Sequence, residues 1–447
     1  MNTKVFRKEL MALAIPLALQ NLLNALVGAS DALMLGRVTQ EAIAAVSLAN
    51  QVSFVMSLFN GAVIGSISVL VSQYWGKKDY IRAKRFHAMA IRYAIIISMT
   101  FSLLALFMPE KLMRIFTTEA DLIQIGADYL KIVSFSYIFA GLSQCYLMVM
   151  KIAGYAKISV YISAVTVVVD MILDLFLIYG IGGFPALGAN GTAYTTIFVE
   201  VIAFVWCFIW SKNKDNVRLS TENLLYFSRV YEKDVWKIIP GMLSSSLAWG
   251  LSISAQTIIL GRLGTEATAA ASVTGVVMQL IQCLGHGLAS GSGIMIAGLL
   301  GNNELEKAKE YGHRFWRVSI WCGIINVGLI CVFGPLAYYF YVLEPLAKSY
   351  LVKMLIFSAF YLFAFAFNTI YTCGVFPAGG DSMYDAVSVF FATWCFALPL
   401  AFIGCFVFHW PVMLVYIVMR IDEIVKEPFI PRRIRKYIWL RNLTRAE

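Results

Sequence analysis

Long apolar runs alternate with short polar gaps along almost the whole chain. About twelve runs can be distinguished, at residues 10–36, 42–75, 86–108, 127–150, 157–182, 187–211, 236–261, 266–300, 313–341, 349–374, 383–408 and 410–430. Most exceed the roughly 20 residues that a helix needs to cross the hydrocarbon core of a bilayer. The pattern therefore predicts an all-α, polytopic membrane protein with about twelve transmembrane helices.

The composition agrees with this class and excludes others. The chain is 60% hydrophobic and 14% charged, whereas soluble proteins are about 45–50% apolar and about 25% charged. We expect no cleavable signal peptide, because the first apolar run continues without a small-residue cleavage site. The eight cysteines stand singly inside apolar runs, with no CxxC pair. Neither a metal site nor a disulfide framework is indicated.

Basic residues gather in every second gap, which explains the net charge of +10 without a nucleic-acid partner. The basic gaps are residues 76–85, 151–157, 212–237 and 302–317, together with both ends of the chain. Loops rich in Lys and Arg stay on the cytoplasmic side. We therefore expect a multi-pass protein of the cell membrane, with both termini in the cytoplasm. The basic tail is either an amphipathic surface segment or disordered chain.

The two halves of the chain repeat each other at a nearly constant shift. Matching pairs include Ile15-Pro16 with Ile239-Pro240, Leu35-Gly36-Arg37 with Leu260-Gly261-Arg262, and Ala153-Gly154 with Ala378-Gly379. The repeat predicts two homologous six-helix bundles. The expected boundaries are an N-terminal lobe at 1–211, a cytoplasmic linker at 212–235, a C-terminal lobe at 236–430 and a tail at 431–447. Transporters built from parallel repeats bind substrate near the midplane and rock one repeat against the other.

The first apolar run carries both a carboxylate, Asp31, and a proline, Pro16. A charged Asp at the centre of a membrane helix costs roughly 2.5–3.5 kcal/mol, so such a residue usually has a function. Proline removes a backbone hydrogen bond and bends a helix. We therefore expect Asp31 to bind a proton or cation and Pro16 to allow bending. The alternative is that Asp31 lies near the outer end and is simply solvated.

Two further acids, Asp170 and Asp174, stand one helical turn apart in the fifth run. Residues at i and i+4 share a helix face, so their carboxylates should lie close together. Both cannot be ionised cheaply at this separation, and the pair is expected to hold a proton. In the repeat these positions fall opposite Cys395 and Pro399, and Asp31 falls opposite Gln256. The intramembrane acids are therefore concentrated in the first half.

Several short motifs occur in a fixed order on this duplicated frame. They are Ile15-Pro16, Asp31 and Leu35-Gly36 in the first run, Gly76-Lys77-Lys78-Asp79 after the second, Leu173-Asp174-Leu175-Phe176 in the fifth, Gly188-Ala189-Asn190-Gly191-Thr192-Ala193 at the sixth, and Ala378-Gly379-Gly380-Asp381 in the second half. With them the chain resembles the multidrug and toxic compound extrusion (MATE) family, in the branch related to the DNA-damage-inducible F proteins.

The resemblance implies an antiporter that exports organic, often cationic, compounds in exchange for H⁺ or Na⁺, with the ion gradient as energy source and no cofactor. It also implies a cation site in the first lobe that pairs Asp31 with Asp174. The family usually has Asn where this chain has Asp170, so the third acid is a departure. Thr192 and Tyr129 match polar positions that line the same cavity in relatives; Tyr129 could instead be an interface anchor.

The remaining polar residues of the apolar runs bear on the coupling ion and on the cavity. Gln256 and Asn368 stand near positions where the sodium-coupled branch carries acids, which favours coupling by protons through the first lobe. Na⁺ at Asp31 and Asp174 stays open, because carboxylate oxygens also suit hard cations. Glu200 either lines the cavity or forms a polar helix contact. Gln20 and Asn24 complete the expected cavity, together with Gln256 and Asn368.

We therefore expect a monomeric membrane antiporter of small organic compounds that has no enzymatic activity. A flippase of lipid-linked precursors is the nearest alternative, and it would need a strongly cationic cavity. A membrane enzyme would need a nucleophile–base pair or a metal constellation, but the four histidines are scattered. Composition also allows a channel or a receptor, which the two-part repeat disfavours.

Overall fold

A computed structural model describes residues 3–35, 38–215, 217–341 and 343–445, and these residues form helices and connecting turns without a strand. Within these described ranges, ten helices are long and apolar enough to cross a membrane, and α5 and α6 make an eleventh span if their 50° bend is counted within one crossing. The all-α polytopic fold is thereby confirmed. Gly36 and Arg37 of the first motif lie outside the described residues.

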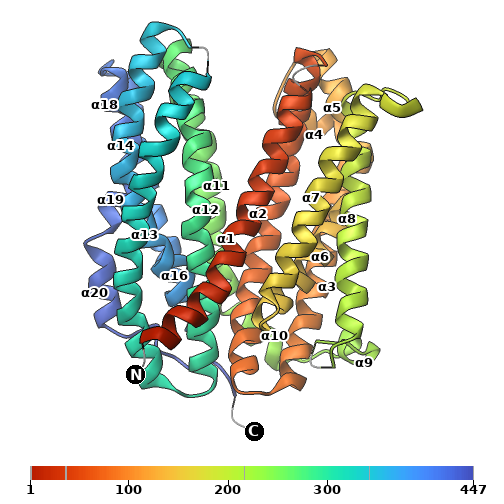
Figure 1. Ribbon diagram of the computed structural model, residues 1–447, viewed down its shortest axis with the longest axis vertical. Coiled ribbons are helices and arrows are strands. Elements are labelled where there is room, and N and C mark those ends of the chain that lie inside the picture. The colour runs from red at the N-terminus through yellow and green to blue at the C-terminus, as the bar shows by residue number, and fades with distance from the viewer. Residues whose placement is uncertain (1–2, 36–37, 216, 342, 446–447) are drawn as a thin grey trace. The chain divides into compact units, whose positions relative to one another are not determined.

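The chain divides into two compact units (Figure 1). The N-terminal unit comprises Gln20–Val71 and Asp79–Lys233, and the C-terminal unit comprises Met1–Leu19, Ser72–Lys78 and Asp234–Glu447. Three helices therefore contribute to both units: α1, α2 and α10. The units differ from the sequence-based lobes at residues 1–19 and 72–78, which group with the C-terminal unit, and at 212–233, which group with the N-terminal unit. The lobe boundaries stay a prediction.

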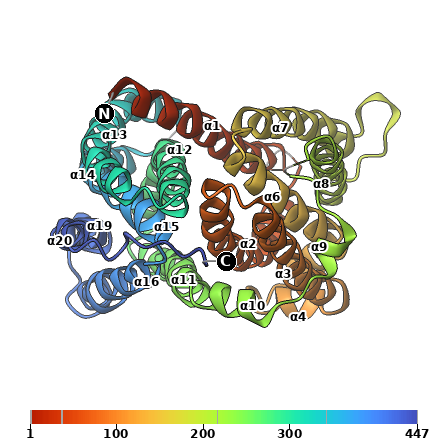
Figure 2. The same cartoon turned by 90° about the horizontal axis from the view of Figure 1, so that it is seen from below.

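The N-terminal unit is built around α6, which packs on α3 on one side and on α7 and α8 on the other (Figure 2). Its elements are α1 (Thr3–Leu35, second half), α2 (Gln40–Gly76), α3 (Tyr80–Phe107), α4 (Pro109–Met113), α5 (Ala120–Val133), α6 (Ser136–Ile152), α7 (Ala156–Tyr179), the 3-10 turn η1 (Ile181–Gly183), α8 (Ala189–Lys212), α9 (Thr221–Leu225) and the start of α10 (Arg229–Trp236).

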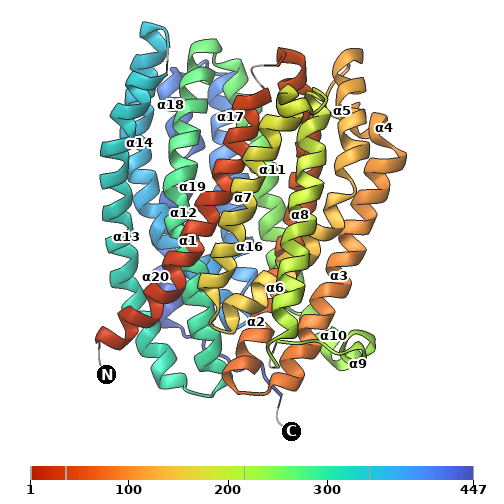
Figure 3. The ribbon, with the colours of Figure 1, turned by 45° about the vertical axis from the view of Figure 1, so that its right-hand side comes forward.

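The C-terminal unit is built around α12, α13 and α14, which pack on one another (Figure 3). Its remaining elements are α11 (Ile239–Arg262), the π-helical stretches η2 (Ile370–Val375) and η3 (Phe390–Ala397), α15 (Phe376–Ala378), α16 (Met383–Val389), α17 (Leu398–Phe406), α18 (Val412–Met419), α19 (Asp422–Lys426) and α20 (Phe429–Arg435). The three long helices are α12 (Thr265–Gly301), α13 (Leu305–Phe340) and α14 (Pro345–Thr369).

The twelfth predicted span, 410–430, is not one continuous helix. It is divided into α18 and α19, with a break at Arg420 and Ile421. The charged residues on the far side of the break, Asp422, Glu423 and Lys426, are all buried. The apolar residues before the break, Val412–Met419, favour a continuous helix, whereas the charged residues Arg420, Asp422 and Glu423 are the sequence signal that the span is interrupted.

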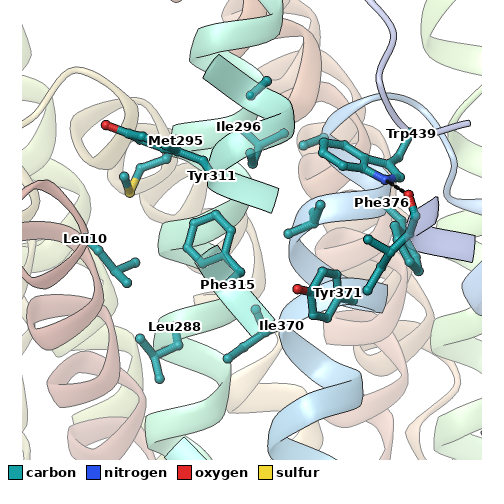
Figure 4. Packing of buried hydrophobic residues seen from close by; sticks show 14 of the residues in the cluster. Leu10, Leu288, Met295, Ile296, Tyr311, Phe315, Ile370, Tyr371, Phe376 and Trp439 are labelled. Atoms are coloured by element: carbon teal, nitrogen blue, oxygen red, sulfur yellow. Dashed lines mark hydrogen bonds between the residues drawn. The ribbon is translucent and has the colours of Figure 1, made fainter. Parts of the chain in front are cut away.

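Part of the predicted tail belongs to the C-terminal core. Trp439 is fully buried and belongs to a cluster with Phe315, Tyr371 and Phe376 (Figure 4). Its indole Nε1 donates to the carbonyl oxygen of Ile434 over 3.3 Å. The tail is therefore packed at Trp439, and the disordered alternative does not describe this part of it.

Candidate functional site

Three carboxylates from two helices meet in the N-terminal unit. Asp31 comes from α1, and Asp170 and Asp174 come from α7; one carboxylate oxygen of each lies within 4.8 Å of the other two. Asp170 and Asp174 are only 6% and 1% exposed, and Asp31 is half-buried. Each has one buried oxygen with no hydrogen-bond partner among the described residues. Ionised carboxylates in such a place need a proton or a cation as counter-charge.

Side-chain contacts fix α1 against α7 on either side of this acid cluster. Toward the start of α7, the Gln20 side chain donates to Ser163 Oγ over 2.8 Å. At its other end, the Tyr179 hydroxyl donates to the carbonyl oxygen of Met34 over 2.7 Å. Both helices are seen side by side in Figures 1 and 3. The two contacts set the register that brings Asp31 opposite α7.

Helix α8 approaches α7 closely beside the cluster. A Cβ atom at Gly191 would lie 2.9 Å from the carbonyl carbon and oxygen of Leu177, which is closer than real side chains come to a backbone. Glycine is therefore required where α8 passes α7. This close approach supports the turn of α7 that carries Asp174.

The cluster opens into a cavity of about 320 Å³ in the N-terminal unit. Five of the residues that the sequence analysis expects at the site line this cavity: Asn24, Asp31, Tyr129, Asp170 and Glu200. Its other lining residues are Val27, Asn50, Ser53, Met56, Val133, Ser136, Tyr137, Ala140, Thr166, Val167, Thr196 and Val199. The wall thus combines carboxylates, amides and hydroxyls with aliphatic side chains. Pockets for small organic ligands have this character.

Hydrogen bonds between helices hold the polar wall. The Tyr129 hydroxyl donates to Asn50 Oδ1 over 3.2 Å, and the hydroxyls of Ser53 and Tyr137 are 2.9 Å apart. The Asn50 and Ser53 side chains were not anticipated from the sequence, although two polar residues at i and i+3 in an apolar run are a usable signal.

Glu200 also has a defined partner on a neighbouring helix. The Ser143 hydroxyl donates to its carboxylate over 3.1 Å. Both readings of the sequence, a cavity residue and a polar helix contact, therefore describe this side chain.

The other sequence candidates lie elsewhere. Gln20 and Thr192 are buried in the N-terminal unit but are not among the residues lining the cavity; the Thr192 hydroxyl donates to Ala189 of its own helix over 2.8 Å. Gln256 on α11 and Asn368 on α14 belong to the C-terminal unit, as does Pro16 inside α1. Their roles remain predictions.

The apolar helices and the buried acids define a multi-pass membrane protein with a polar internal site. The MatE family model matches residues 16–176 and 240–403, one stretch in each half of the sequence. The chain belongs to the MatE family, as the sequence motifs indicate. Its placement in the branch of the DNA-damage-inducible F proteins stays a prediction.

Relatives and solved structures agree with this family. The "Probable multidrug resistance protein YoeA" of Bacillus subtilis is 25% identical over 87% of this chain and 85% of its own length. The "Uncharacterized transporter YisQ" of the same organism is 22% identical over 97% and 95%. A solved MOP superfamily transporter from Pyrococcus furiosus superposes with a TM-score of 0.86 at 17% identity, over 96% of each chain. A MATE protein in a bent conformation superposes with 0.84 at 17% identity, again over 96% of each.

Proposed function

We propose that this protein is a secondary active antiporter that exports small organic, often cationic, compounds in exchange for H⁺, with Na⁺ as the alternative coupling ion. The observation that carries the proposal is the meeting of Asp31, Asp170 and Asp174 within 4.8 Å, beside a cavity in the N-terminal unit. The names of relatives such as YoeA, which include multidrug resistance, support the substrate class.

The acid cluster can couple the two fluxes by charge. When the carboxylates are ionised, the cavity wall is negative and favours an organic cation. When protons bind them, the negative charge is removed and the cation is released. Each pH unit of gradient supplies about 1.4 kcal/mol, and each charge moved through 100 mV supplies about 2.3 kcal/mol.

Helix α1 connects this exchange to a conformational change in the proposal. Asp31 stands on the part of α1 in the N-terminal unit, and Pro16 interrupts the hydrogen bonding of the part in the C-terminal unit. A change of charge at Asp31 alters the contacts of the first part, and the helix can bend at Pro16. Substrate and ion would then be exposed to the two sides of the membrane in turn.

The donor set fits a bound Na⁺ as well as protons. Na⁺ is a hard cation, and the carboxylate oxygens of Asp31 and Asp174 are suitable ligands. A flippase for lipid-linked anions is less well supported, because neither Lys nor Arg is among the described residues that line this cavity.

We also propose a location in the cell membrane with both termini in the cytoplasm, from the distribution of basic gaps. The functional unit in this proposal is a monomer.

Transport in proteoliposomes tests the proposal, with the pH gradient and the Na⁺ gradient imposed separately. Ethidium, a fluorescent organic cation, serves as substrate. We expect a pH gradient alone to drive accumulation against the ethidium gradient. Accumulation with Na⁺ alone would assign the coupling ion to Na⁺, and accumulation with neither gradient would refute antiport.

A further inference from the structure

A second buried charged cluster lies in the C-terminal unit, on the short helix α19. The Lys426 ammonium is 2.7 Å from Glu423 Oε1. The Asn368 side chain of α14 donates to Glu423 Oε2 over 2.7 Å. The Thr393 hydroxyl of η3 donates to Asp422 Oδ2 over 2.9 Å. Side chains from three separate elements thus meet here. None of these side chains belongs to the site proposed above.

Interrupted helices surround the cluster. Asn368 stands two residues before α14 changes into the π-helix η2, and Thr393 lies within the π-helix η3. Asp422 opens α19 directly after the break that ends α18. π-helical stretches inside α-helices occur frequently at functional sites, and breaks are places where helix segments can shift. A change of charge here would act where three elements can move.

The charges of the cluster do not balance. Two cations, Arg420 and Lys426, interact with three carboxylates, Asp385, Asp422 and Glu423. Full ionisation therefore leaves one negative charge in excess in a buried place. Isolated buried charge is costly, and proteins remove it by binding a proton or a counter-ion.

Asp422 is the carboxylate with an unused oxygen. Its Oδ2 accepts from Thr393, whereas its Oδ1 is buried and has no hydrogen-bond partner among the described residues. Glu423, in contrast, has its two oxygens engaged by Lys426 and Asn368. Buried polar atoms in structural ion pairs are normally satisfied, so the orphan oxygen points to a bound proton.

Other titratable groups lie near the cluster. Among the described residues, no third cation lies as close to its carboxylates as Arg420 and Lys426 do. Tyr361 of α14 interacts electrostatically with Asp422 and Glu423, and its ring lies 5.7 Å from the guanidinium of Arg420. His286 of α12 and the half-buried carboxyl group of Glu427, directly after α19, both interact with Glu423, and Glu427 adds to the negative charge. The nearest groups on α14, α12, η3 and α16 therefore leave the excess negative charge uncompensated.

We propose that Asp422 is a second proton-binding carboxyl group, which takes up and releases one proton during the transport cycle. A proton from water bonds to Oδ1. The two negative charges of Asp385 and Glu423 then balance the two positive charges of Arg420 and Lys426. Loss of the proton restores the excess charge and draws a cation toward Asp422, which moves the segments at the breaks. The inference deepens the proposed antiport and rests on it for its place in the cycle.

Infrared difference spectroscopy of the purified full-length protein tests the proton directly. Protonated carboxylic acids have their own C=O stretching band, which disappears on ionisation. Besides the bands of Asp31, Asp170 and Asp174, which the proposed function also predicts, we expect one further band in the wild type that titrates with pH and responds to saturating ethidium. The band should be absent from Asp422→Asn and unchanged in Glu344→Gln, a control at an exposed acid that opens α14.

Two further variants keep the test independent of folding and of the first acid cluster. Thr393→Val retains Asp422 but removes its hydroxyl donor, so the band should remain with a shifted frequency. A variant with Asn at positions 31, 170 and 174 should keep the Asp422 band although coupled transport fails. Superimposable spectra of wild type and Asp422→Asn at every pH would overturn the proposal.

Transport stoichiometry supplies the functional measurement. Reversal potentials in proteoliposomes should show one proton fewer per ethidium for Asp422→Asn than for the wild type. An unchanged stoichiometry would overturn the role of Asp422 in the cycle. Absence of proton coupling in the wild type would instead refute the proposed function, while the infrared titration still decides whether Asp422 binds a proton.

Discussion

Replacing Trp439 by Ala removes a large side chain from the C-terminal core. Trp439 is 0% exposed and packs among residues of α12, α13 and the α14–α15 region. Trp-to-Ala changes in cores typically cost about 3–5 kcal/mol of the free energy of unfolding. A unit of this size loses about 2–4 °C in Tm per kcal/mol, so we expect a decrease of about 10 °C.

The fit of the indole against α13 allows a stricter version of this prediction. A Cβ atom at Gly312 would lie 2.5 Å from Cη2 and 2.7 Å from Cζ2 of Trp439. Gly312→Ala should therefore cost about 1–3 kcal/mol through overpacking. In the Trp439→Ala background the new methyl group enters the vacated space, and the same change should cost nothing or stabilise. The expected coupling energy is about 1–3 kcal/mol.

Thermal unfolding of the four proteins, followed by fluorescence-detected size exclusion, completes the double-mutant cycle. Trp321→Ala is the matched control, because Trp321 lies on the same helix as Gly312 but is 63% exposed. It should lower Tm much less than Trp439→Ala. Equal losses for the two tryptophans, or additive effects of Gly312→Ala and Trp439→Ala, would refute the packed tail.

Three further changes test the N-terminal unit. Asp170→Asn should keep transport but move its pH optimum downward, since it removes the repulsion between two acids a turn apart; an unchanged profile measured by efflux at several pH values would show that Asp170 does not sense Asp174. Glu200→Gln should weaken ethidium binding several-fold by removing a charge from the cavity wall, and an unaltered Kd would exclude that contact. Gly191→Ala should cost about 1–3 kcal/mol by forcing α8 away from Leu177, and wild-type thermal stability would contradict the close approach.

The fold class could be predicted from the sequence because a bilayer demands long apolar helices and leaves little choice of structure. The meeting of Asp170 and Asp174 followed from helical spacing. Their approach to Asp31 required the register of α1 on α7, which the contacts at Gln20 and Tyr179 set. Spacing along one helix contains no information about that register; only the resemblance to the family implied it.

Other features depended on partners distant in the sequence. The sequence places Glu423 and Lys426 at the end of the twelfth apolar run, and it does not show that Asn368 and Thr393 lie beside this segment. The tail can be interpreted as exposed or disordered chain because five arginines lie among its apolar residues. The burial of one side chain, Trp439, decides its position. Polar residues that pair across helices leave only a weak signal in a single sequence.

The most direct measurement of the central claim separates energy coupling from substrate movement in Asp31→Asn. Proteoliposomes containing the wild type or the variant are assayed for accumulation of ethidium driven by a pH gradient, and for exchange of ethidium at equilibrium without any gradient. If the acid cluster couples the fluxes, the variant loses accumulation but still exchanges ethidium. Accumulation at the wild-type rate in Asp31→Asn would contradict the account.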